Sequence, residues 1–108
     1  MTSDAQSASA AGAVVHDEAG QRFSLKLGSY EAVLMYARRG DVLDFYHIYV
    51  PDPYRKRGIA GRILKAAFDH ARDQGLKVVP SCPFIAGDFL PRFPCYQDLV
   101  ERGEFPFV

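Results

Sequence analysis

The sequence has no tryptophan, only two cysteines and no surplus of either charge. Lys and Arg number 13, as do Asp and Glu, and a domain without a basic surplus is poorly suited to the phosphate backbone of nucleic acids. Cys82 and Cys95 are too few for a disulfide scaffold and form no CxxC pair. His16, His47 and His70 are scattered along the chain. We therefore expect no nucleic-acid partner and no metal site.

Long hydrophobic runs are also missing, since no apolar stretch approaches the ~20 residues that a membrane-spanning helix needs. Residues 1–12 lack the Lys or Arg and the apolar run of a signal peptide, which predicts a cytoplasmic protein. The Ser- and Ala-rich residues 1–13 are predicted to form a disordered tail. The chain of 108 residues includes eight Phe and six Tyr, enough for one core, so residues 14–108 are predicted to form a single domain.

Alternating and apolar runs predict four strands, at residues 14–16, 22–27, 31–37 and 42–50, separated by turns that contain glycine. The fourth run, VLDFYHIYV, has apolar or aromatic residues at both its odd and its even positions, which predicts a central strand covered on both faces. Strand parity alone places His47 on the face that carries Leu43, Phe45 and Tyr49.

After the fourth strand, the apolar residues recur with the spacing of a helix. Apolar residues predict an amphipathic helix of about four turns from Ile59, closed by Gly75, and a fifth strand at 76–79. A strand-helix-strand crossover returns the fifth strand parallel to the fourth. The expected fold is a mixed α/β (α+β) domain with a mostly antiparallel five-stranded sheet, one long central helix and a short C-terminal helix.

Prolines mark the ends of these elements. Pro51 and Pro80 follow the fourth and fifth strands, and a proline cannot donate to the ladder, so we expect these two strands to splay apart there. The chain after the fifth strand is expected to be irregular or briefly helical, with Pro91 and Pro94 as breaks and a weak helix over 94–102.

The segment VPDPYRKRGIAG, residues 50–61, carries the most chemistry. A helix N-terminus presents unpaired amides and a partial positive charge, and Gly58, Ala60 and Gly61 let an anion approach them. Three cations precede them, at residues 55–57, and would attract a phosphate. The pattern predicts a pyrophosphate site, although small residues that only let the helix pack tightly on the sheet would give the same sequence. It is neither a Walker loop nor a GxGxxG fingerprint.

Arg55-x-x-Gly58-x-Ala60 after a strand that ends in Val50-Pro51 resembles the acetyl-CoA pyrophosphate loop of the Gcn5-related N-acetyltransferases (GNAT). Over about residues 14–100 the chain is similar to the short YjdJ-type subgroup, in HIYVP (47–51), YRKRGIA (54–60), GLKVVP (75–80), CPFI (82–85) and FPCYQDLV (93–100). It departs from the subgroup at Phe93, where His is usual, and at Cys95, where Glu is usual.

The resemblance implies a GNAT-like fold with a splayed fourth and fifth strand and acetyl-CoA as co-substrate. The backbone of Ile48, Tyr49 and Val50 would pair with the pantetheine arm, and the Val50 amide would act as an oxyanion donor. The expected binding residues of the loop are Arg55, Lys56, Arg57, Gly58, Ile59, Ala60 and Gly61.

Three side chains are candidates for the transfer itself. Histidine has an unperturbed pKa of about 6.5, so His47 is a candidate base, or else a hydrogen-bonded residue of the sheet. Cys82 follows the fifth strand and is a candidate nucleophile, or else a small buried thiol. Tyr96 is a candidate acid for the departing CoA thiolate, or else a packing residue of the last helix.

The function expected from these residues is transfer of an acetyl group from acetyl-CoA to an amine. No motif identifies the acceptor, a small molecule or a protein, or sets the oligomeric state. The rival interpretation is a non-catalytic module that binds CoA and acetyl-CoA, because these short chains lack the N-terminal helices that build an acceptor site in larger relatives. A third interpretation is that the Phe-rich residues 105–108 dock a partner protein.

Overall fold

The computed structural model describes residues 13–101. In chain order its elements are β1 (Val15–Asp17), β2 (Arg22–Leu27), β3 (Tyr30–Arg39), β4 (Val42–Tyr49), η2 (Asp52–Tyr54), α1 (Ile59–Gln74), β5 (Lys77–Val79), η3 (Ile85–Phe89), α2 (Leu90–Arg92) and η4 (Pro94–Leu99). The predicted tail, apart from residue 13, and the Phe-rich C-terminal end lie outside the described residues.

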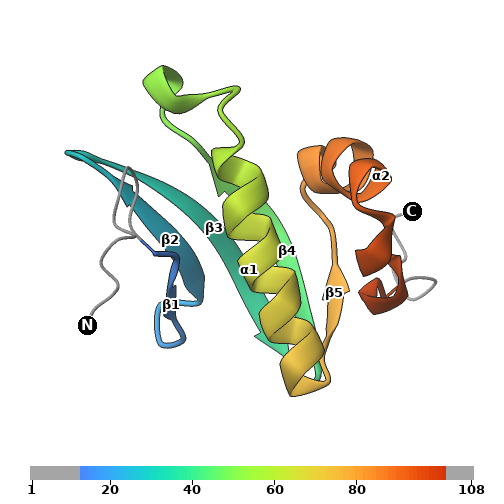
Figure 1. The fold of residues 1–108 in the computed structure, drawn as a ribbon. Coiled ribbons are helices and arrows are strands. Elements are labelled where there is room, and N and C mark those ends of the chain that lie inside the picture. Colours follow the sequence, from blue (N-terminus) through green and yellow to red (C-terminus); the bar gives the residue numbers. More distant parts are fainter. Residues whose placement is uncertain (1–12, 102–108) are drawn as a thin grey trace.

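The strands form one sheet in the order β1-β2-β3-β4-β5, with α1 lying across one face (Figure 1). Neighbouring strands are antiparallel except for β4 and β5, which are parallel. The predicted fold class, a mostly antiparallel five-stranded sheet with one long helix, is therefore confirmed.

The hydrophobic core lies between α1 and the sheet. Alternate residues of β2 and β3 face the helix, and one apolar stripe of α1 packs against them. The fully buried side chains of these three elements are Leu25, Ala32, Leu34, Ile63, Leu64, Ala67, Phe68 and Ala71.

The end of α1 follows from Gly75, as the sequence predicts. Gly75 has a φ of 71° in the left-handed region, and its amide donates to the carbonyls of Ala71 and Arg72. The Leu76 amide donates to the Ala71 carbonyl at 2.8 Å. This hydrogen-bond pattern closes the last turn and redirects the chain into β5.

A β-bulge in β4 corrects the expected orientation of its residues. Tyr36 pairs with Phe45 and Met35 pairs with His47, so Tyr46 is an extra residue without a partner on β3. After the bulge the even-numbered residues of β4, rather than the odd-numbered ones, face the core. Ile48 shows this, because it pairs with the fully buried Leu34. His47 consequently lies on the face opposite to Phe45, and the parity prediction for His47 was wrong.

The same bulge leaves part of β4 uncovered. Tyr46 and Tyr49 are each 47% exposed, so the prediction of a strand covered on both faces is wrong for its second half. In the first half, Leu43 and Phe45 are almost fully buried on one face, and Val42 and Asp44 on the other face are half-buried.

The strands β4 and β5 separate toward their carboxyl ends (Figure 1). Their pairing runs from Val42 with Lys77 to Asp44 with Val79, and the Cys82 amide adds one bond to the Phe45 carbonyl at 3.1 Å. Among residues 13–101 no strand pairs with this edge of β4 beyond that point. The pairing between β4 and β5 therefore ends at Val79, directly before Pro80 as expected, whereas on β4 it ends several residues before Pro51.

The chain after β5 is more regular than expected. Residues 83–92 are continuously helical and include a π-helical stretch, η3, before α2. Pro91 lies inside this segment, shortly after its π-helical stretch, and does not break it. No helix within residues 13–101 has the length and hydropathy needed to cross a membrane.

Candidate functional site

A cavity of about 760 Å³ opens where β4 and β5 separate. Its walls come from the carboxyl end of β4, the start of α1 and the helical segment after β5. The lining residues are His47, Ile48, Tyr49, Val50, Tyr54, Arg55, Lys56, Gly58, Ile59, Ala60, Gly61, Cys82, Phe84, Asp88 and Arg92. With two exceptions, Arg57 and Tyr96, the structure brings every sequence-predicted site residue to this one cavity.

The start of α1 offers unpaired backbone donors to the cavity. Within residues 13–101 no side chain caps the helix, and the first amide that bonds to a carbonyl of this turn is that of Arg62, which donates to the Gly58 carbonyl at 3.1 Å. The amides of Ile59, Ala60 and Gly61 precede that bond, and all three residues line the cavity. Free amides and the positive end of the helix dipole make this position suitable for an anion.

The glycines at this helix start are not explained by packing. A Cβ atom built on Gly58 or Gly61 would meet no atom of the rest of the described chain within 4 Å, the adjoining residues and the backbone of the same helix aside. The alternative that small residues only let the helix pack tightly on the sheet is therefore wrong for these two positions. Gly58 also has a φ of 76°, which side-chain-bearing residues adopt only at a cost. The open space at both glycines is free for a ligand.

The three cations of the loop differ in their surroundings. The Arg55 guanidinium is held by the Val50 carbonyl at 2.9 Å and the Asp52 carboxylate at 2.8 Å. Lys56 lines the cavity and has a φ of 64°, a strained value for a residue other than glycine. The Arg57 guanidinium lies over the Tyr54 ring, 5.7 Å from its centroid, and Arg57 is not part of the cavity lining.

His47 and Cys82 reach the cavity from opposite sides of the splay. His47 is exposed on β4, whereas Cys82 is 9% exposed and its sulfur is a free thiol. The Cys82 carbonyl accepts bonds from the amides of Ile85 and Ala86, at 3.0 and 3.3 Å, so Cys82 precedes the first turn of the helical segment.

Four lining residues were not predicted as site residues: Tyr54, Phe84, Asp88 and Arg92. Asp88 and Arg92 form an ion pair at 2.9 Å across one helical turn, so this wall of the cavity is charged. Their spacing of four residues is the signal that could have found them, but it has meaning only on a helix, and this stretch was expected to be irregular or only briefly helical.

Tyr96 lies away from the cavity. It is buried, its ring packs on Phe68 and Phe89, and its hydroxyl donates to the Asp69 carboxylate at 2.9 Å. Burial, together with the hydrogen bond to Asp69, raises the pKa of Tyr96 to about 12. This geometry fits the packing interpretation, and we do not include Tyr96 in the proposed chemistry.

The variant Tyr96→Phe is expected to lower the free energy of unfolding by about 1 kcal/mol, the usual value of one hydrogen bond. It should leave the affinity for acetyl-CoA unchanged. The folded protein holds the phenol proton to higher pH than the unfolded chain, so the stability from this group is full below pH 10 and is lost as the pH rises to about 12. Thermal melts over this window check the prediction. Tyr46→Phe, on an exposed ring, is the matched control.

Comparisons with known proteins identify the family. A sequence model of the GCN5-related N-acetyl-transferase family matches residues 22–99. The protein NATD1 of Mus musculus is 41% identical over 75 residues, 67% of this chain and 68% of that protein. NATD1 of Gallus gallus is 40% identical over 75 residues, with the same coverage.

The fold leads to the same family. A GCN5-like protein from Staphylococcus aureus, solved in solution by NMR, aligns with a TM-score of 0.62 and 25% identity over 88% of this chain and 95% of that one. The chain therefore belongs to the GCN5-related N-acetyltransferase family.

Proposed function

We propose that the cavity binds acetyl-CoA and that the protein transfers its acetyl group to an amine. One observation carries the proposal: the uncapped start of α1, with open space at Gly58 and Gly61, lines the same cavity as His47 and Cys82. An anion site thus lies beside a candidate nucleophile and a candidate base. The family assignment supports the same coenzyme.

The pyrophosphate is proposed to sit on the amides of Ile59, Ala60 and Gly61. Lys56 lines the same cavity and adds a positive charge. Arg55 holds the loop in shape through its bonds to Val50 and Asp52. Arg57, which does not line the cavity, is proposed to act only by attraction at a distance.

The pantetheine arm is proposed to follow the edge of β4 that lacks a partner strand. Its amides can pair with the backbone of Ile48, Tyr49 and Val50, in the manner of an added strand. All three residues line the cavity. The Val50 amide is proposed to donate to the thioester oxygen as it gains negative charge.

The transfer is proposed to use Cys82 and His47 in turn. His47 first takes the proton of the Cys82 thiol, and the resulting thiolate attacks the thioester carbon. A new carbon–sulfur bond forms, the bond to the CoA sulfur breaks, and the departing CoA thiolate takes the proton back from His47. The acceptor amine then attacks the acetyl-cysteine, which releases the Cys82 thiolate. His47 takes the proton that the amine loses, because a neutral amine is needed and an amine of the lysine type is protonated at neutral pH. The other route is direct attack by the amine on acetyl-CoA with His47 as base.

Three finer assignments belong to the proposal. The acceptor is a small molecule or a protein amine. We place the chain in the short YjdJ-type subgroup on the segments that resemble it, apart from Phe93 and Cys95. We also propose a cytosolic location, in keeping with the absence of a disulfide between Cys82 and Cys95.

Calorimetric titration with acetyl-CoA and CoA, followed by assay against a panel of amines, tests this function. We expect one binding site per chain and release of free CoA with at least one amine. Absence of binding at millimolar ligand would end the proposal. Binding without turnover of any amine, with equal affinity for CoA and acetyl-CoA, would favour a non-catalytic module that senses the coenzyme.

A further inference from the structure

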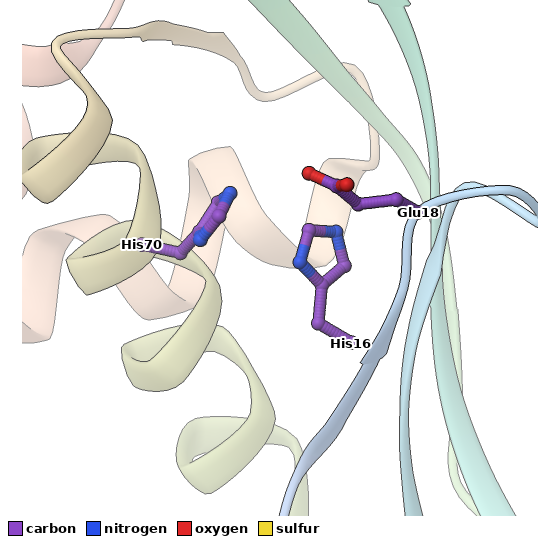
Figure 2. A group of neighbouring side chains, drawn as sticks. All are labelled: His16, Glu18 and His70. Carbon is purple, nitrogen blue, oxygen red and sulfur yellow. The ribbon is translucent and has the colours of Figure 1, made fainter.

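Two histidines that are far apart in the sequence meet on the helix face of the sheet. His16 lies on β1, Glu18 in the turn that follows, and His70 in the second half of α1. One ligand atom from each of the three lies within 4.8 Å of the others. Figure 2 shows the two imidazole rings and the carboxylate turned toward one another. The sequence interpretation of scattered histidines therefore needs correction for this pair.

The His16 ring is held in place by its neighbours. It stacks on Phe23 with a centroid distance of 4.1 Å and an interplanar angle of 4°. Its Nε2 shares a hydrogen bond of 2.6 Å with the Tyr36 hydroxyl. When Nε2 donates in this bond, Nδ1 carries the free lone pair, and Figure 2 shows Nδ1 on the side of His70. A histidine ligand of a metal is usually oriented in this way, by a partner on its other nitrogen.

The other two residues have donor atoms to spare. Among residues 13–101, no hydrogen bond or ion pair engages the His70 ring nitrogens or the Glu18 carboxylate. The His70 ring meets the His16 ring edge-on at a centroid distance of 4.5 Å. Asp17 is engaged elsewhere, since its carboxylate lies 3.7 Å from Arg22 and accepts from the Gly20 amide at 2.9 Å.

We propose that His16, Glu18 and His70 bind one divalent transition-metal ion of the zinc type, with water in the fourth position. Two imidazoles and one carboxylate are a ligand set that zinc accepts in tetrahedral geometry. At metal–ligand distances near 2.1 Å, the ligand atoms of a tetrahedral site would lie about 3.4 Å apart. The ligand atoms must therefore approach one another by about 1.4 Å at most, and Glu18 can make this movement because it lies in an exposed turn.

The site is separate from the acetyl-CoA cavity. His70 lies eleven residues after Ile59, which is about 16 Å along the helix axis from the cavity. None of the three ligands lines that cavity. A metal here would join the edge hairpin of β1 and β2 to α1.

Titration of the metal-free protein with Zn²⁺ by calorimetry, and with Co²⁺ by visible absorption, tests the site. We expect one equivalent of metal, a tetrahedral Co²⁺ spectrum without a thiolate charge-transfer band, and a rise in Tm with Zn²⁺. His70→Gln and Glu18→Gln should each weaken binding at least tenfold, the smallest loss seen even for outer partners of a metal site. Asp73→Asn, which removes an exposed carboxylate from the same helix, is the matched control and should bind normally.

Three results would overturn the site. One is the absence of stoichiometric binding. Another is unchanged affinity in both His70→Gln and Glu18→Gln. The third is loss of binding in Cys95→Ser, which would place the ion at the exposed thiol instead. Because Glu18 lies in an exposed turn, its variant remains informative even where His70→Gln disturbs folding.

Discussion

Replacing Gly58 with valine is expected to abolish binding of acetyl-CoA. The new side chain would project into space that no protein atom fills and that we assign to the pyrophosphate. It would also disfavour the φ of 76° that turns the loop into α1, and so displace the amides of the first turn. Both effects act on the proposed anion site, so calorimetric titration should show no heat at ligand concentrations that saturate the native protein.

Gly40→Val is the control that distinguishes loss of the anion site from loss of stability in Gly58→Val. Gly40 has a φ of 63°, and a Cβ atom there would also meet nothing within 4 Å. It lies in the turn between β3 and β4 and does not line the cavity. Each variant should lose about 1–3 kcal/mol of stability to backbone strain. Only Gly58→Val should lose the coenzyme, and a folded Gly58→Val that binds normally would contradict the anion site.

Gly61→Ala isolates the steric part of the same argument. Gly61 lies within α1 and has no positive φ, so the change adds no backbone strain. Alanine in place of glycine stabilises a helix by about 1 kcal/mol. The variant should therefore melt at a higher temperature and yet bind acetyl-CoA more weakly. Normal affinity in Gly61→Ala would mean that the ligand does not approach this turn closely.

The loop and helix could be predicted because their signals are local. The left-handed closure at Gly75 and the small residues at 58, 60 and 61 are properties of the sequence within one turn. Each of them depends on backbone sterics that no distant contact overrides. The cavity could be anticipated for the same reason, since a helix that begins directly after a strand and a basic loop presents its free amides at the strand end.

The bulge at Tyr46 could not be predicted in this way. Its presence is visible only in the pairing of Met35 with His47 and of Tyr36 with Phe45, which is a property of two strands rather than one. Strand parity assumes no extra residue, so one unpaired position reversed the predicted face of His47.

The cluster of His16, Glu18 and His70 also depends on tertiary structure. Two histidines separated by most of the domain share no local pattern, and they meet only because β1 pairs with β2 beneath the second half of α1. Spacing rules for metal ligands detect sites built within one loop or hairpin. These spacing rules do not detect a site whose ligands come from both a sheet and a helix.

Removal of the Cys82 thiol is expected to stop acetyl transfer if the reaction follows the two-step route. The native protein, incubated with acetyl-CoA without an acceptor, should gain one acetyl group, about 42 Da, visible by intact mass. Cys82→Ala should lose both this adduct and nearly all turnover. Cys95→Ala, at an exposed thiol that does not line the cavity, is the matched control and should keep both.

Replacement of His47 should further distinguish the two-step route through Cys82 from direct attack by the amine. His47→Gln is expected to slow turnover by about 10²-fold or more, as for removal of a general base. In the two-step route Cys82 and His47 act as a unit, so the double variant should be no slower than the slower single variant. A Cys82→Ala protein that turns over at the native rate, beside an inactive His47→Gln, would reject the cysteine intermediate in favour of direct attack. Binding of acetyl-CoA should persist in both variants, since the pyrophosphate is proposed to be bound by backbone amides at the start of α1.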